Sequence, residues 1–216
     1  MRVRLRPVHA DTAAFYSERY PGGYHHDRWP DHVERVAATV DFARGLLTDG
    51  LVNSVADLSC GDGAVARGIV ETPGARIHRV VLGDVNIPKE LIVSSLDRNG
   101  SWPESIVFWE GTLDQTMASL EDRPVDLFVS SETLEHLDDP DAYLRAAREK
   151  SRYLLLTTPD GEQPSADGGG NVEHYWGWDA EAVSSMLHEA GWRVTDHRIF
   201  TPVSADVYRF QMWTAY

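Results

Sequence analysis

The sequence predicts an α/β fold built on a doubly wound, mostly parallel sheet of seven strands. Short apolar runs alternate with helix-like segments from residue 52 to residue 200. This alternation is typical of βαβ units, with helices on both faces of one sheet. The last two apolar runs have no helix between them, so we expect them to pair as an antiparallel C-terminal hairpin. A length of 216 residues fits one domain of this kind.

Residues that start and stop helices set the boundaries of the predicted elements. Asp31 and Asp179 can accept the free N–H groups of a helix start, and Pro140 fits a first helical turn. Gly50 and Gly191 stand where helices are expected to end. The expected helices are residues 11–20, 31–48, 63–70, a helix opened by Pro88, 139–149 and 179–189. The expected strands are residues 52–58, 76–82, 105–109, 125–130, 152–157, 192–200 and 207–215.

Side-chain spacing also predicts how some segments pack. Within the helix over 31–48, apolar residues recur at helical spacing and predict the buried face, formed by Val33, Val36, Val40, Ala43 and Leu47. The aromatic residues at 175–178 are expected in a loop, and so is the glycine-rich stretch at 167–171.

The composition excludes several classes of function. The chain has 20 basic and 34 acidic residues, and the net charge of −14 argues against avid, non-specific binding to nucleic acid. No apolar run reaches the roughly 18 residues of a membrane span, and none follows the basic start as in a signal peptide. Cys60 is the single cysteine, which excludes an internal disulfide framework and fits a cytoplasmic location.

Two loops at neighbouring strand ends indicate a nucleoside site. Gly61 and Gly63 follow the first strand, and without a Cβ they allow a sharp turn close to a ligand at a helix N-terminus. The turn is not the G-x-G-x-x-G fingerprint, because Ala66 replaces its last glycine, and the sequence has no P-loop motif. Asp84 ends the second strand and can accept both hydroxyls of a ribose. Alone, Asp84 could simply form a turn, but both loops together favour the nucleoside.

The segment from Asp57 to Gly63 resembles the glycine-rich first motif of the class I, Rossmann-like, S-adenosylmethionine-dependent methyltransferases. Ser59 stands where the first glycine of that motif usually lies, and Asp84 matches the family's ribose-binding acid. After the fourth strand, the string Glu132-x-x-Glu135-His136 is similar to one in many small-molecule methyltransferases. The resemblance runs from about residue 52 to the C-terminus, and it implies a Rossmann-like fold, S-adenosylmethionine as cofactor and methyl transfer.

The resemblance also implies which residues bind the cofactor. Thr112 stands where many members place an aspartate against the adenine, and the backbone of Leu113 is an alternative contact. The cofactor-binding residues implied in this way are Asp57, Ser59, Gly61, Gly63, Asp84, Thr112, Leu113, Ser131 and Glu132.

Related enzymes often close an N-terminal arm over the cofactor, which suggests a division of this chain into two parts. Residues 1–50 would form a helical arm or lid, and residues 51–216 the methyltransferase domain. The alternative is that the helix from Asp31 packs on the sheet and the arm residues are ordinary surface or core. The candidates for closing the lid are Tyr16, Tyr20, His25, His26, Arg28 and Trp29.

Methyl transfer is an in-line displacement, so the enzyme mainly has to align acceptor, methyl group and sulfur. A hydroxyl acceptor must lose its proton, and histidine suits that role near neutral pH. His136 is the first candidate base and His174 the second, while Glu132 is placed to orient the acceptor. A structural role is the alternative for His136. We therefore expect methylation of a hydroxyl oxygen on a small molecule, without a metal, a membrane or a nucleic-acid partner.

Two other functions stay open at this point. Glu132, Glu135 and His136 have the i, i+3 and i+4 spacing of one helical face, and with His174 they could bind Mg²⁺ or Mn²⁺. The small-RNA 3′-end 2′-O-methyltransferases use a similar set, although the same string occurs in metal-free relatives and the acidic composition disfavours RNA. The other alternative is a non-catalytic scaffold that binds a nucleoside.

Overall fold

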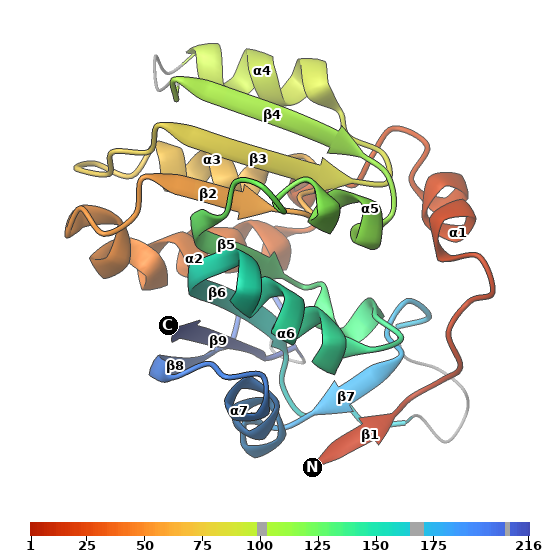
Figure 1. Cartoon of the computed structure of the whole chain (residues 1–216). Helices are drawn as coiled ribbons and strands as arrows, with labels where there is room; N and C mark the ends of the chain where they lie inside the picture. Colours follow the sequence, from red (N-terminus) through yellow and green to blue (C-terminus); the bar gives the residue numbers. More distant parts are fainter. Residues whose placement is uncertain (99–102, 165–170, 206–207) are drawn as a thin grey trace.

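A computed structural model describes residues 1–98, 103–164, 171–205 and 208–216. Its main sheet has seven strands in the order β4-β3-β2-β5-β6-β9-β8 (Figure 1). The first five strands in this order run parallel, and β9 is antiparallel to both β6 and β8. The predicted fold is therefore confirmed. The strands are β2 Ser54–Asp57, β3 Arg79–Asp84, β4 Ser105–Glu110, β5 Val125–Ser131, β6 Ser151–Pro159, β8 Val194–Phe200 and β9 Phe210–Ala215.

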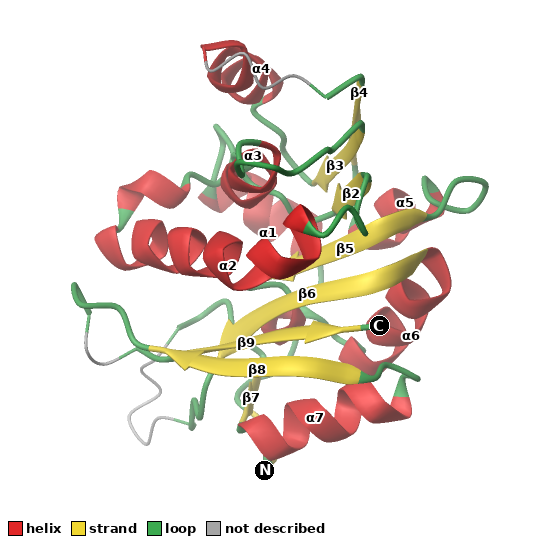
Figure 2. Cartoon of the chain, turned by 90° about the vertical axis from the view of Figure 1, so that its left-hand side faces the viewer, coloured by secondary structure: helices red, strands yellow, loops and turns green. Residues whose placement is uncertain are grey.

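Helices cover both faces of the sheet (Figure 2). On one face, Phe42, Val65 and Ile92 anchor α2, α3 and α4 in a buried apolar cluster. On the other, α5, α6 and α7 bury residues such as Leu144 and Leu187 in a second cluster. The α-helices are α1 Thr12–Arg19, α2 Pro30–Thr48, α3 Ala64–Val70, α4 Lys89–Arg98, α5 Leu113–Ala118, α6 Pro140–Lys150 and α7 Ala180–Glu189.

The N-terminal helix α1 lies beside the carboxyl ends of the parallel strands (Figure 1). Asp11 starts it, because its side chain accepts the N–H of Ala14 at 2.9 Å. The expected helix over 11–20 is confirmed. Its position brings the arm to the edge of the sheet where open α/β folds bind their ligands.

The start and the buried face of α2 differ from the prediction. Pro30, not Asp31, occupies the first helical position, because its fixed φ suits N1 and it needs no N–H partner there. The predicted apolar face was wrong at Val33, which is 49% exposed. The helix is rotated so that Arg35 and Thr39 face inward. The Arg35 guanidinium donates a hydrogen bond to the Ser131 hydroxyl, and the Thr39 hydroxyl donates one to the carbonyl oxygen of Arg35. The buried residues of α2 are Arg35, Thr39, Phe42, Ala43 and Leu47.

Two strands and one α-helix of the described residues were not predicted from the sequence. Residues 176–178, which were expected in a loop, instead form β7 (Trp176–Trp178), which pairs antiparallel with β1 (Arg2–Arg4) in a separate two-stranded sheet. The guanidinium groups of Arg2 and Arg4 lie 4.3 and 4.4 Å from the ring of Trp176. The third element is α5, which begins with a capping box between Thr112 and Gln115.

Smaller differences concern strand ends and the parts of the chain that are described. β2 is shorter than the predicted 52–58, and β3 runs from Arg79 to Asp84 rather than over 76–82. Most of the predicted glycine-rich loop at 167–171, and the start of the last strand at residue 207, fall outside the described residues. In the described ranges, no helix combines the length and apolar character needed to cross a membrane. The cytoplasmic location stays a prediction.

Candidate active site

The turn after β2 requires its glycines. Gly61 and Gly63 have φ angles of 53° and 72°, a left-handed conformation that side chains disfavour. A Cβ on Gly63 would lie 3.2 Å from Cγ1 of Ile92, so Gly63 lets α4 pack against the turn. Ser59 and Gly61 line a large cavity, whereas Gly63 does not.

Asp84 connects the end of β3 to this turn. Its Oδ2 accepts the N–H of Gly61 at 2.8 Å, and its Oδ1 accepts the N–H of Val85 at 2.7 Å. Burial raises the pKa of the Asp84 carboxyl, while these backbone hydrogen bonds oppose the rise. Asp84 lines the cavity, but Asp57 does not; burial raises the pKa of Asp57 to about 7. The structure thus places Asp84, and not Asp57, where it can contact a ligand.

The N-terminal arm is fastened over the glycine turn. Asp62 accepts hydrogen bonds from the backbone N–H of His26 at 3.1 Å and from its Nδ1 at 2.6 Å. A Cβ on Gly61 would lie 3.2 Å from Cδ1 of Tyr24. Gly61 therefore makes room for the arm as well as for any ligand, which the sequence analysis did not foresee.

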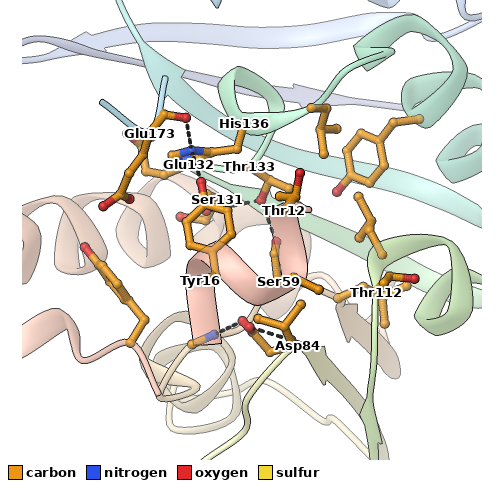
Figure 3. A pocket seen from close by; sticks show the side chains of 18 of the residues that line it. Thr12, Tyr16, Ser59, Asp84, Thr112, Ser131, Glu132, Thr133, His136 and Glu173 are labelled. Atoms are coloured by element: carbon orange, nitrogen blue, oxygen red, sulfur yellow. Dashed lines mark hydrogen bonds between the residues drawn. The ribbon is translucent and has the colours of Figure 1, made fainter. Parts of the chain in front are cut away.

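One cavity of about 1300 Å³ joins the predicted cofactor loops to the predicted catalytic residues. Figure 3 shows Asp84 at one end, Glu132 and His136 at the other, and Tyr16 of α1 pointing toward His136. Small-molecule pockets commonly measure about 300–1000 Å³, so this volume suits a nucleoside cofactor together with a small acceptor. The predicted residues that line it are Ser59, Gly61, Asp84, Thr112, Leu113, Ser131, Glu132, His136 and His174.

The expected helical face at Glu132, Glu135 and His136 was wrong. Only a short 3₁₀ turn, η2 (Leu134–His136), is present, and Glu132 precedes it with a left-handed φ of 53°. Its carboxylate accepts the hydroxyl of Thr157 at 3.0 Å. A non-glycine residue in this conformation is costly by about 1–3 kcal/mol and is found mainly at functional sites.

Glu135 is fully buried below this turn. Its Oε2 accepts the hydroxyl of Thr158 at 2.9 Å, whereas its Oε1 has no hydrogen-bond partner among the described residues. Burial, reinforced by the nearby charge of Glu132, raises the pKa of Glu135 to about 8. Glu135 is therefore mostly protonated at neutral pH.

Both ring nitrogens of His136 face polar groups. Nδ1 lies 2.9 Å from the carbonyl oxygen of Glu173 and 2.7 Å from the hydroxyl of Tyr16, and Nε2 lies 3.7 Å from Oε1 of Glu135. Because a carbonyl only accepts, Nδ1 carries the proton and donates it, which leaves the Nε2 lone pair free. Burial, with a contribution from the charge of His174, lowers the pKa of His136 to about 3.

His174 differs from His136 because both of its ring nitrogens are bonded. Nδ1 is paired with the carboxylate of Glu162, and Nε2 lies 2.9 Å from the side-chain amide nitrogen of Asn171. Burial alone would lower the pKa of His174, but the Glu162 carboxylate raises it above its ordinary value. Ligand atoms of Glu135, His136 and His174 lie within 4.8 Å of one another, so they could meet a metal ion only if His174 gave up one of these bonds.

Several residues of the arm complete the cavity, and some of them were not predicted. Tyr20 donates a hydrogen bond to the Glu173 carboxylate at 2.6 Å, and Arg19 pairs with the same group. Arg35 of α2 also lines the cavity, although it was predicted neither as a site residue nor as a buried one. A charged residue on the buried face of a helix is the sequence pattern that could have indicated Arg35 as a site residue.

A sheet of this strand order, with a glycine turn and an acidic residue at neighbouring strand ends, defines a nucleoside-binding α/β protein. Residues 24–197 match the family described as a methyltransferase domain, and the chain belongs to that family. It is an S-adenosylmethionine-dependent methyltransferase of the class I, Rossmann-like type. No curated protein matches the sequence.

Solved structures of similar fold agree with this class. The chain is 19% identical to 1,6-didemethyltoxoflavin-N1-methyltransferase from Burkholderia thailandensis, with a TM-score of 0.68 over 99% of this chain and 93% of that one. It is 14% identical to magnesium protoporphyrin IX methyltransferase from Synechocystis PCC 6803, with a TM-score of 0.67 over 95% and 99%. Both were solved with S-adenosylhomocysteine. EvdMO1 is 17% identical with a TM-score of 0.55; the match covers 83% of this chain but only 40% of that longer one.

The residues present fit S-adenosylmethionine. Asp84 offers carboxylate oxygens at the cavity wall for the ribose hydroxyls, and the turn at Gly61 keeps the adjoining backbone free of side chains. Thr112 and Leu113 line the wall beside Asp84, where an adenine would follow the ribose. The individual contacts of these residues with the cofactor stay predictions.

Proposed function

We propose that this methyltransferase methylates a hydroxyl oxygen of a small molecule. The observation that carries the proposal is the single cavity that joins Asp84 and Gly61 to Glu132 and His136. Tyr16 and Tyr24 of the arm also line this cavity. Small-molecule acceptors named for two structural neighbours, 1,6-didemethyltoxoflavin and magnesium protoporphyrin IX, support the same class of acceptor.

The proposed chemistry places little demand on the protein beyond alignment and the removal of one proton. When bound, S-adenosylmethionine supplies a methyl group on a sulfonium, which is already an activated donor. His136 is neutral at neutral pH, and its Nδ1–H is held by the Glu173 carbonyl, so Nε2 can accept the acceptor's hydroxyl proton. Glu135, whose Oε1 lies 3.7 Å from Nε2, is mostly protonated at neutral pH, so it adds no full negative charge beside the imidazolium that forms. A pKa of about 3 makes His136 a weak base in the empty chain, below the range near the operating pH that favours general-base catalysis.

Glu132 is the residue we propose for orienting the acceptor. Its left-handed backbone projects the side chain into the cavity wall, where Thr157 fixes one carboxylate oxygen. A carboxylate there can accept a hydrogen bond from a second hydroxyl or an amine of the acceptor. The acidic surface of the chain also favours a neutral or cationic small molecule over RNA.

The experiment incubates the chain with S-adenosylmethionine and a panel of hydroxyl-bearing small molecules, and follows S-adenosylhomocysteine release and the mass of the product. His136→Ala is expected to lower kcat by roughly 10²–10⁴ and to leave the Kd for S-adenosylhomocysteine nearly unchanged. His188→Ala, at an exposed position of α7, is the matched control.

Three results would contradict the proposal. If His136→Ala retains the full wild-type kcat, His136 is not the base. If all products are methylated at nitrogen, the accepting group is not a hydroxyl. Cofactor binding without turnover on any acceptor favours the scaffold alternative.

A further inference from the structure

The N-terminal arm contributes aromatic rings to the wall of the cavity. Tyr16, Tyr20 and Tyr24 all line it, and so does Trp29. The ring planes of Tyr16 and Tyr20 are within 12° of parallel, with their centroids 6.5 Å apart. The ring of Tyr24 stacks on that of Trp29, with centroids 5.8 Å apart. Flat ring surfaces of this kind stack favourably on a planar aromatic ligand.

The hydroxyl groups of the three tyrosines are already bonded within the protein. The hydroxyl of Tyr16 lies 2.7 Å from Nδ1 of His136, and that of Tyr20 donates to the Glu173 carboxylate at 2.6 Å. The third tyrosine hydroxyl is paired in the same way with Nδ1 of His32. A sugar presents a hydroxyl on most of its carbons, and each one buried without a partner costs free energy. The arm therefore offers ring surface, rather than free hydroxyl groups, to an acceptor.

The ring of Tyr16 lies next to the proposed base (Figure 3). Its centroid is 5.8 Å from that of the His136 imidazole, and the two planes meet at 85°. An acceptor ring stacked parallel to Tyr16 would cross the imidazole at nearly the same angle. A hydroxyl in the plane of that acceptor ring can then point at the imidazole and donate its proton to Nε2.

The acidity of the acceptor supports the same class of compound. A phenol has a pKa of about 10, whereas an alkyl hydroxyl resembles water, whose pKa is about 15.7. Burial lowers the pKa of His136, so its neutral imidazole is a weak base. A weak base accepts the proton of a phenol far more readily than that of an alkyl alcohol.

We propose that the acceptor is a planar aromatic compound, stacked on Tyr16, and that the methylated hydroxyl is a phenol. This inference rests on the function proposed above, because it names the class of the hydroxyl-bearing small molecule. The phenol oxygen forms a bond to the methyl carbon as the carbon–sulfur bond breaks, and the electron pair of that bond stays on sulfur. The hydroxyl proton passes to Nε2 of His136. The products are an aryl methyl ether and S-adenosylhomocysteine.

The test compares acceptors that differ in aromaticity but not in the number of ring carbons. The pairs are phenol with cyclohexanol and 2-naphthol with decahydro-2-naphthol, each incubated with the wild-type chain and saturating S-adenosylmethionine. In each pair, kcat/KM for the methyl ether, measured by mass spectrometry, should be at least about 100-fold higher for the aromatic member. Calorimetric titration of the S-adenosylhomocysteine complex should show the aromatic member binding about 3- to 10-fold more tightly.

Two variants test whether the ring of Tyr16 provides this preference. Tyr16→Leu removes the ring and should raise the Kd for 2-naphthol by about 3- to 10-fold. Tyr16→Phe keeps the ring and should leave that Kd within about twofold. Tyr216→Leu, at an exposed position, is the matched control. The Kd for S-adenosylhomocysteine reports whether each variant retains a folded site, and the paired acceptors decide on the wild type if Tyr16→Leu does not fold.

The outcomes separate this inference from the proposed function. Equal or faster methylation of the saturated alcohols would overturn the phenol assignment and leave hydroxyl methylation in place. Methylation of aniline, without methylation of any of the four alcohols, would contradict the proposed function itself. Absence of both binding and turnover for phenol and 2-naphthol would overturn the inference. An equal loss of 2-naphthol binding in Tyr16→Phe and Tyr16→Leu would also overturn it, because the contact would then belong to the hydroxyl of Tyr16 and not to its ring.

Discussion

The hydroxyl of Tyr16 lies 2.7 Å from Nδ1 of His136, a residue 120 positions later in the chain. This contact joins the N-terminal arm to the loop after β5 at the end of the cavity that lies away from Asp84 (Figure 3). Burial raises the pKa of Tyr16, so the phenol stays neutral and shares the Nδ1 proton with the Glu173 carbonyl. The arm thus helps to hold the histidine in the tautomer whose Nε2 can accept a proton.

Tyr16→Phe should lower kcat by about 2- to 10-fold, the range for one neutral hydrogen bond, because the Glu173 carbonyl still holds Nδ1–H. Steady-state kinetics would show the change in kcat, and thermal unfolding should show little change in melting temperature. Tyr216→Phe, at the exposed C-terminal residue, is the control. A loss as large as that of His136→Ala would mean that Tyr16 itself takes part in proton transfer.

Asp84→Ala should weaken binding of S-adenosylhomocysteine by about 1.5–3 kcal/mol, the range for hydrogen bonds to a charged group. The carboxylate is expected to accept the ribose hydroxyls, and it also accepts the Gly61 N–H, so the turn loses a support as well. Asp84→Asn retains one acceptor oxygen and should lose less. An unchanged Kd for both variants is incompatible with a ribose contact at this residue.

Glu135 makes stability depend on pH. Its pKa of about 8 in the folded chain exceeds its ordinary value of 4.5, so the folded state holds this proton more tightly. The stabilisation is complete below about pH 4.5 and is lost as pH rises to about 8, with a slope of at most about 1.4 kcal/mol per pH unit. Urea unfolding of Glu135→Gln between pH 5 and pH 8 should therefore show a flatter profile than the wild type. This account would be contradicted if stability depended on pH equally in the wild type and in Glu135→Gln. It would also be contradicted if the exposed variant Glu189→Gln showed the same flattening of the pH profile.

Methyl transfer should survive exhaustive treatment with EDTA. The bonds of His174 to Glu162 and Asn171 occupy both of its ring nitrogens, which leaves it without a lone pair for an ion. Activity measured before and after chelation, with Mg²⁺ and Mn²⁺ added back, provides the comparison. Loss of activity that either ion restores would make Glu135, His136 and His174 metal ligands and would favour the RNA ribose methyltransferase.

The sequence predicted the sheet, the glycine turn and the position of Asp84 at a strand end, because these features depend on local patterns. Gly61 must adopt a left-handed φ, and Asp84 ends a strand with a clear apolar run, so residue type and position suffice. The capping box at Thr112 was equally local, and α5 could have been predicted from it.

Features that depend on distant parts of the chain were not predictable in the same way. Arg35 turns inward because Ser131, far along the chain, offers a partner, and this rotates the buried face of α2. The pairing of β1 with β7 joins segments that lie far apart in the sequence. The left-handed backbone at Glu132 follows from its bonds to Thr157 on β6, whereas spacing alone favoured a helix.

A crystal structure of the chain with S-adenosylhomocysteine tests the central claim most directly. The account predicts the ribose hydroxyls on Asp84, the adenine beside Thr112 and Leu113, and the sulfur facing His136 across space for a small acceptor. Cofactor bound outside this cavity, or bound with its sulfur directed away from His136, would contradict it.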